Sequence, residues 1–159
     1  MPSARSRERP DAANGKAPGR HFRDRELRLV ARPDHLAQAR EWVGVAVAEF
    51  GLTDRQRHDF VFAANEAVTN AIRHGAPDAD GTIAIAIAAE GDGLSLTVSD
   101  CGAWVPAAPE LDPLAESGRG FTFMCRLVDE IQLSTVPGKT RVRLLKRRSP
   151  APGGGGAGS

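Results

Sequence analysis

Residues 59–75 read DFVFAANEAVTNAIRHG, and this stretch limits the folds open to the chain more than any other. As a helix, it places Glu66, Asn70 and His74 at successive four-residue steps, so three polar side chains line one face. Apolar residues recur at spacings of three and four on another face, which predicts packing against a core. Gly75 follows the last periodic residue and predicts the end of the helix. The expected apolar face consists of Phe60, Ala64, Ala67, Val68, Ala71 and Ile72.

The polar face of this helix has two interpretations. A carboxylate, a carboxamide and an imidazole, each one turn apart, can together hold a water molecule, a divalent ion and phosphate oxygens. The simpler interpretation is a solvated helix surface. Taken alone, the helix favours the solvated surface, and the choice depends on the segments that follow it.

Composition restricts the class of protein. A chain of 159 residues with 41% hydrophobic and 26% charged residues predicts one ordinary globular domain. The net charge of +1 gives no reason to expect nucleic acid or an anionic membrane as partner. No apolar run approaches the roughly 20 residues that span a bilayer, and residues 1–25 contain no apolar signal segment. Two cysteines without metal-type spacing favour reduced thiols, so we expect a cytoplasmic protein.

Changes in composition mark the limits of the expected domain. Residues 1–24 are rich in Arg, Pro, Ala and Gly without periodicity, which predicts a disordered arm. Residues 148–159 are rich in Gly and Pro and predict a disordered tail. The folded domain is therefore expected over residues 25–147.

Within these limits, alternation and turn residues predict five strands and two further helices. Asp34 is expected to cap the first helix, and Thr53 or Asp54 to begin the helix that carries Glu66. Most strands connect by hairpins, which predicts an α+β fold: a two-layer sandwich whose mixed, mainly antiparallel sheet carries helices on one face. The expected strands are 25–31, 82–89, 94–99, 130–135 and 140–146; the expected helices are 34–50, 54–74 and 118–129.

Three further segments carry candidate site residues. Asp100-Cys101-Gly102 ends a strand, and its glycine allows a sharp turn that leaves the carboxylate able to accept a hydrogen bond from an exocyclic amine such as that of adenine. Ser117-Gly118-Arg119-Gly120-Phe121 precedes a helix and is a sensible phosphate cradle, although an ordinary capped helix would explain it too. Gly138-Lys139-Thr140 is, alone, only a turn.

The order of these segments is more specific than any one of them. Glu-x-x-x-Asn-x-x-x-His on a helix, Asp-x-Gly after a strand, Gly-x-Gly opening a helix and Gly-x-Thr before the last strand follow one another. This order resembles the histidine-kinase-like (gyrase, Hsp90, histidine kinase and MutL) ATP-binding superfamily. Residues 66–75 and 117–124 are most similar to the anti-sigma factor serine/threonine kinases, and the resemblance covers residues 25–147.

The resemblance implies a role for each polar helix residue. Asn70 would coordinate Mg²⁺ bound to the phosphates of ATP. Glu66 would be the catalytic base that takes the proton from the attacking hydroxyl. His74, at the end of the helix, would be structural. These roles suit phosphoryl transfer, which depends mainly on positioning and charge neutralisation.

The resemblance also assigns the nucleotide contacts of the loops. Asp100 would bind the adenine amine, and Gly102 would allow the base to approach closely. Thr140 would support the adenine end of the site. The phosphates would lie against Gly118, Arg119 and Gly120.

Family partners follow from the same resemblance. It implies an anti-sigma factor that holds a sigma factor and phosphorylates a serine or threonine of an anti-anti-sigma protein. It also implies a homodimer, while the composition predicts no direct contact to nucleic acid or membrane. An alternative from another class is a regulatory module that binds ATP or a partner without catalysis. A sensor histidine kinase fits less well, because His58-Asp59 lies on the same helix as Glu66 and could not reach a bound γ-phosphate.

Two features depart from the family pattern. Trp104 stands where the family often has a second glycine, and it would either stack near the nucleotide or narrow the pocket. Residues 103–117, the expected lid over the phosphates, are short and rich in proline, which predicts limited lid motion.

Overall fold

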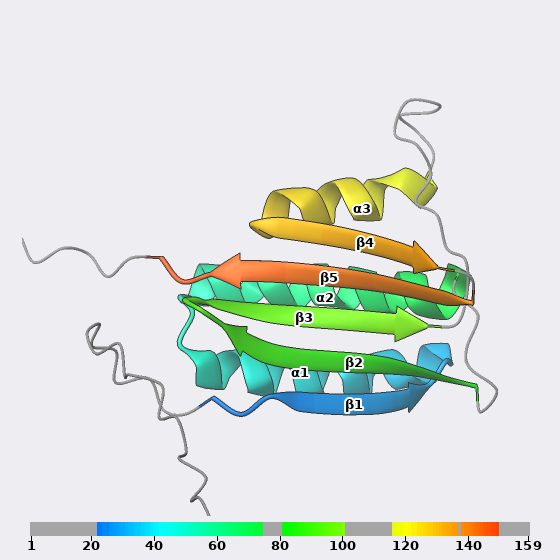
Figure 1. The fold of residues 1–159 in the computed structure, drawn as a ribbon, viewed down its shortest axis with the longest axis horizontal. Coiled ribbons are helices and arrows are strands. Elements are labelled where there is room, and N and C mark those ends of the chain that lie inside the picture. Colours follow the sequence, from blue (N-terminus) through cyan, green and yellow to red (C-terminus); the bar gives the residue numbers. More distant parts are fainter. Residues whose placement is uncertain (1–21, 75–80, 101–115, 137, 150–159) are drawn as a thin grey trace, which may run out of the picture.

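The computed structural model describes residues 22–74, 81–100, 116–136 and 138–149, with the side chains of His74 and residues 116–119 left out. These residues form one sheet with helices packed on one of its faces (Figure 1). The elements are β1 (Arg25–Val30), a 3₁₀ turn (Pro33–His35), α1 (Leu36–Phe50), α2 (Asp54–His74), β2 (Thr82–Glu90), β3 (Gly93–Asp100), α3 (Glu116–Leu127), β4 (Glu130–Val136) and β5 (Lys139–Arg147).

The sheet has five strands in the order β1-β2-β3-β5-β4. Every pairing among these strands is antiparallel. Two local hairpins, β2–β3 and β4–β5, join side by side through the pairing of β3 with β5. The predicted α+β two-layer sandwich is therefore confirmed, with an antiparallel sheet in place of the mixed one that we expected.

The core lies between the sheet and the helices. Alternate residues of β2 and β3 point into it, with Ile85 and Leu96 fully buried. On the helix side, α2 contributes Phe60 and Val68 together with four buried alanines. Among the described residues, no helix covers the opposite face of the sheet, which faces the viewer in Figure 1.

The start of α2 is closed by reciprocal hydrogen bonds. The backbone N–H of Gln56 donates to Thr53 Oγ1 at 3.2 Å, and the backbone N–H of Thr53 donates to Gln56 Oε1 at 3.1 Å. This capping box satisfies two backbone donors that the helix leaves without partners. The start at Thr53 or Asp54 that the sequence predicts is thus confirmed.

Two predicted helix limits were wrong. Asp34 does not cap α1, because it lies inside the 3₁₀ turn that precedes the helix. α3 spans Glu116–Leu127 instead of 118–129. It ends early because Asp129 binds the neighbouring strand: its backbone N–H donates to the Leu145 carbonyl at 2.9 Å, and its carboxylate accepts the Arg147 N–H at 2.6 Å.

The two predicted arms fall mostly outside the described residues. At their inner ends, Phe22 lies edge-on to the ring of Phe50, with ring centroids 5.5 Å apart. The guanidinium of Arg148 lies 4.2 Å above the same ring and donates to the Phe50 carbonyl at 2.6 Å.

None of the described helices has the length and apolar character needed to cross a membrane.

Replacing Phe60 tests the packing of α2 on the sheet. The ring is fully buried, so Phe60→Ala is expected to lower the free energy of unfolding by about 3–5 kcal/mol. Phe62→Ala is the matched control two residues away, because Phe62 is 43% exposed and its loss should cost about 1 kcal/mol. Chemical denaturation of both variants measures the difference. Equal losses would mean that α2 does not bury the face assigned to it.

Candidate functional site

Two of the predicted helix residues lie on the same side of α2. Glu66 and Asn70 are one turn apart and half-buried, whereas the apolar face of the helix is covered by the sheet. The capping box and the buried alanines together set the rotation of α2 about its axis. The polar stripe therefore faces away from the sheet's centre and remains accessible. The third residue of the stripe, His74, ends α2, and its side chain is not described.

Asp100 and Thr140 are directly opposite each other in the β3–β5 pairing. Asp100 is the last residue of β3, and Thr140 is the second residue of β5. Their exposed fractions are 7% and 1%, and they are among the few polar side chains of the described chain that the core buries. Both engage in polar or electrostatic contacts. The sheet thus joins two residues from separate predicted motifs into one buried polar pair.

The elements that carry the predicted residues converge on one end of the molecule (Figure 1). The C-terminal half of α2, the end of β3, the start of β5 and the N-terminus of α3 all lie at the right-hand edge of that view. The opposite edge holds the β2–β3 turn and the C-terminal end of β5. The predicted site residues therefore share one end of the fold although they come from four elements.

Gly120 lies directly against the carboxylate of Glu66. A β carbon built on Gly120 would be 2.6 Å from Glu66 Oε2 and 3.7 Å from its Cδ atom. No ordinary side chain fits at that distance without displacing the carboxylate. Glycine at this position allows the close approach of the carboxylate and does not serve an unusual backbone angle, since Gly120 is not among the residues with positive φ.

The two other residues of the Gly-x-Gly segment lie inside α3. The helix begins at Glu116, two residues before the predicted start, so Gly118 and Arg119 belong to its first turn. The first N–H groups of a helix have no intrahelical partners and attract anions, so the segment still presents backbone donors at this end. Gly102 and Trp104 lie outside the described residues, as does most of the expected lid.

The described residues contain no group of three or more His, Cys, Asp or Glu side chains that could hold a metal ion. Mg²⁺ prefers octahedral oxygen ligands and commonly keeps water while it binds substrate phosphates and one or two protein oxygens. A single amide oxygen such as that of Asn70 is consistent with that mode of binding.

The sequence did not point to a second set of residues around Glu66. Arg40 on α1 donates through Nε and Nη2 to the Asn65 amide oxygen, at 3.4 and 3.3 Å. Phe62 on α2 and Phe123 on α3 form a tilted aromatic pair with centroids 6.3 Å apart. The four-residue spacing of Phe62 and Glu66, together with the absence of Phe62 from the expected apolar face, was a usable signal for its position.

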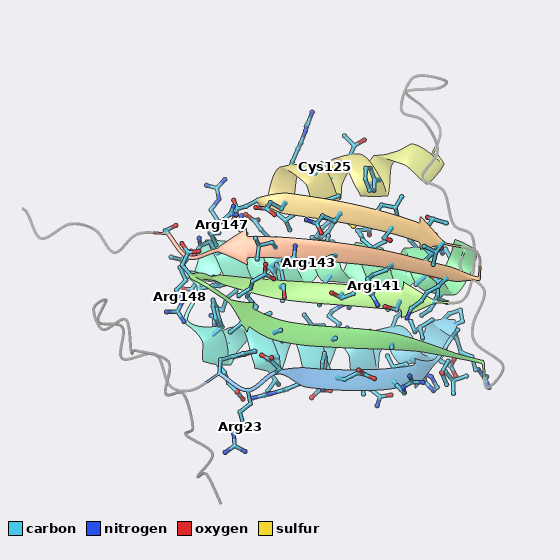
Figure 2. All side chains as sticks on the ribbon, in the orientation of Figure 1. Arg23, Cys125, Arg141, Arg143, Arg147 and Arg148 are labelled. Atoms are coloured by element: carbon cyan, nitrogen blue, oxygen red, sulfur yellow. The ribbon has the colours of Figure 1, made fainter. Side chains whose placement is uncertain are left out.

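The uncovered face of the sheet carries a row of basic side chains. Figure 2 shows Arg141, Arg143 and Arg147 along β5, on the face turned to the viewer. A hollow of about 410 Å³ lies beside this row and extends from β1 to β5. Arg143 pairs with Glu90, and Arg147 pairs with Glu130, which raises the pKa of the Arg147 guanidinium. Glu66 and Asn70 do not line this hollow.

The family model and the similar proteins found by comparison agree with one another. Residues 29–146 match the histidine kinase-like ATPase domain. An anti-sigma F factor of Clostridium acetobutylicum is 30% identical over 131 residues, which are 77% of this chain and 92% of that protein. The anti-sigma F factor of Geobacillus stearothermophilus is 32% identical over 130 residues, or 76% and 89% of the two chains. The serine-protein kinase RsbW of Bacillus pumilus is 27% identical over 130 residues, or 72% and 80%.

A solved structure shows the same fold. The crystal structure of the RsbU and RsbW domains of Rv1364c from Mycobacterium tuberculosis matches with a TM-score of 0.62 at 24% sequence identity. The match covers 79% of this chain and 32% of the other, so this chain corresponds to about a third of that larger protein. At this identity the likeness speaks for the fold alone.

A double-mutant cycle tests the contact between Gly120 and Glu66. Alanine is favoured over glycine inside a helix by about 1 kcal/mol, so Gly120→Ala should stabilise a chain that already carries Glu66→Ala. With Glu66 present, the carboxylate must move, and we expect that gain to be reduced or cancelled. Thermal unfolding of the four chains measures the coupling.

Gly44→Ala on α1 is the control for helix propensity. A β carbon at Gly44 meets nothing within 4 Å, so its stabilisation should be the same in the wild-type chain and in the Glu66→Ala chain. If Gly120→Ala behaved like Gly44→Ala in both backgrounds, Gly120 would not contact the carboxylate.

Proposed function

We propose that this chain, which belongs to the family of histidine kinase-like ATPase domains, is an ATP- and Mg²⁺-dependent protein serine/threonine kinase that also acts as an anti-sigma factor. The observation that carries the proposal is the contact between Glu66 and Gly120. In this contact a half-buried carboxylate lies beside the N-terminal turns of α3, at the end of the fold where Asp100 and Thr140 meet. A carboxylate in this position lies where a phosphate and an incoming hydroxyl would have to meet.

The residues at this end of the fold are suited to a magnesium nucleotide. Asp100 and Thr140 offer buried polar atoms for the base, and Asp100 as a carboxylate accepts a hydrogen bond from the adenine amine. Gly118 and Arg119 lie in the first turn of α3 and Gly120 follows them, at the end of the helix where free N–H groups and the helix dipole favour phosphate. Because Gly120 has no side chain, α3 can approach the Glu66 carboxylate closely.

Asn70 holds the metal between these two regions in the proposal. It lies one turn beyond Glu66 on the same face of α2, and its amide oxygen is a neutral hard ligand. Such a ligand orients the ion without competing with the phosphates for its charge. Gly102, which would allow the base to approach closely, belongs to the same proposal.

Glu66 performs the proton transfer in this proposal. ATP supplies the phosphoryl group when it is bound. A Glu66 carboxylate oxygen would accept the proton of a serine or threonine hydroxyl while the hydroxyl oxygen bonds to the γ-phosphorus, the bond from phosphorus to the β,γ-bridging oxygen breaks, and ADP leaves. Gly120 lets the carboxylate lie on the side of α2 that faces α3, so the base is positioned before the acceptor arrives.

The partners in this proposal are two proteins. The acceptor is an anti-anti-sigma protein that carries the serine or threonine, and the sequestered partner is a sigma factor. The names of the relatives support this assignment, since they are an anti-sigma F factor and a serine-protein kinase. We further propose that the chain is a cytoplasmic homodimer that contacts neither nucleic acid nor membrane.

Calorimetry of ATP binding tests the site itself. Wild-type protein is expected to bind ATP in the presence of Mg²⁺ and to lose most of that affinity when the ion is chelated. Asn70→Ala should lose the part of the ATP affinity that depends on Mg²⁺, because it removes the proposed metal ligand. An absence of binding at millimolar ATP would contradict the proposal and would direct attention to Trp104, which takes the place in the sequence where the family often has a second glycine.

Replacing Glu66 separates catalysis from sequestration. Glu66→Gln keeps the size and hydrogen bonding of the side chain but cannot accept the proton at neutral pH, so phosphotransfer should fall about 10²–10⁴-fold. ATP binding and partner binding should persist. Radiolabel transfer from ATP to a panel of purified anti-anti-sigma proteins provides the measurement. Partner binding without any phosphotransfer in the wild-type chain would favour a non-catalytic sequestering module.

A further inference from the structure

We propose that the aromatic pair Phe62–Phe123, with the adjoining groove between α1 and α2, is the docking surface for the protein whose hydroxyl is phosphorylated. This inference rests on the proposed function, and it names the place where the acceptor contacts the kinase. The groove has a volume of about 550 Å³ and is lined from both helices.

The aromatic pair is the first observation. Phe62 is 43% exposed and Phe123 is 52% exposed, although they lie 6.3 Å apart and contact each other. Large aromatic side chains that remain half-exposed together on a helix surface are unusual in a domain with a complete core. Aromatic residues of this kind commonly supply most of the binding energy when a partner covers them.

The position of the pair relative to Glu66 is the second observation. Phe62 and Asn70 lie one turn to either side of Glu66 on the same face of α2, each about 6 Å along the axis. Asn70 lies toward the end of the fold that carries Asp100 and Thr140. Phosphoryl transfer places the entering and leaving oxygens on opposite sides of phosphorus. With the nucleotide on the Asn70 side of Glu66, as proposed above, the acceptor approaches Glu66 from the side of Phe62.

α3 contacts both Glu66 and Phe62 of α2. Gly120 contacts the Glu66 carboxylate, and Phe123, three residues later, contacts Phe62. The base and the aromatic pair thus lie side by side along the α2–α3 contact. A folded partner typically covers about 800 Å² of each surface, so one whose hydroxyl reaches Glu66 necessarily covers these rings.

The charge of the groove indicates the chemistry of the acceptor. Its lining includes Arg40, Arg57 and His58, against a single carboxylate from Asp54 that pairs with Arg57 at 2.6 Å. Arg40 donates to the neutral amide oxygen of Asn65, so that contact leaves its charge uncompensated. An acceptor with acidic side chains beside its serine or threonine would complement this lining.

The terminal segments of this chain are poorer candidates for the same surface. Residues 1–21 contain five Lys or Arg against two Asp or Glu, so their charge has the same sign as the lining. Residues 150–159 carry no charged side chain and no aromatic ring. Neither segment complements both the rings and the charge.

The test measures acceptor and nucleotide separately in the full-length protein. Phe62→Ala, Phe123→Ala and the double variant are compared with Val136→Ala on β4, a control because Val136 is 51% exposed. The acceptor is the anti-anti-sigma protein to which the wild-type chain transfers phosphate. We expect the double variant to raise KM for that protein about tenfold or more, with the Kd for ATP within about twofold of wild type. Val136→Ala should change neither quantity.

Each contrary outcome has a distinct meaning. An unchanged KM for the acceptor in the double variant overturns the docking surface while leaving the kinase assignment intact. A parallel loss of ATP affinity also overturns it, because the rings would then belong to the nucleotide site. Conversion of a dimer to a monomer with unchanged KM, seen by sedimentation, would show that a second copy covers the rings. Failure of the wild-type chain to phosphorylate any acceptor while it binds ATP overturns the proposed function, and the docking surface with it.

Discussion

The burial of four alanines of α2 in the core formed by the sheet and the neighbouring helix is the constraint on which the rest of the structure depends. Ala63, Ala64, Ala67 and Ala71 are all buried, and their small size lets the helix lie close to β3 and β5. Because the buried stripe has one best orientation on the sheet, the helix cannot rotate without losing it. The direction of Glu66 and Asn70 is therefore fixed by residues that take no part in chemistry, and α3 packs against the face that this orientation leaves open.

Much of the fold could be predicted from the sequence, because its signals are local. The alternation Ile83, Ile85, Ile87 marks β2, and Gly91 with positive φ closes its hairpin with β3. The start of α3 could not be predicted so well. Two glycines in its first turns weaken the helix pattern there, and its end is set by contacts of Asp129 with a distant strand. The pairing of β3 with β5 is likewise a tertiary result that no local pattern contains.

The candidate site also has features that the sequence predicts and features that depend on tertiary packing. The spacing of Glu66 and Asn70 is a property of one helix, so the sequence places them on one face. The contact of Gly120 with Glu66 depends on how α3 crosses α2, and that crossing is decided by packing. Phe62 is absent from the apolar face that the helical pattern predicts, so its surface position agrees with the sequence, but its contact with Phe123 depends on how α3 crosses α2. The most informative departures from the sequence pattern thus lie beside the residues with proposed chemical roles, where local preferences often give way to function.

The register of Asp100 against Thr140 has a consequence for the order in which the molecule assembles. The two residues are 40 positions apart, and the intervening chain includes α3 and β4. Closing so long a segment costs conformational entropy before the stabilising contacts between the two strands have formed. This pairing therefore forms more slowly than either local hairpin. The buried polar pair consequently does not exist in a partly folded chain that holds only the hairpins. A ligand that contacts both residues can bind only the finished sheet, and it would protect that late pairing most from local opening.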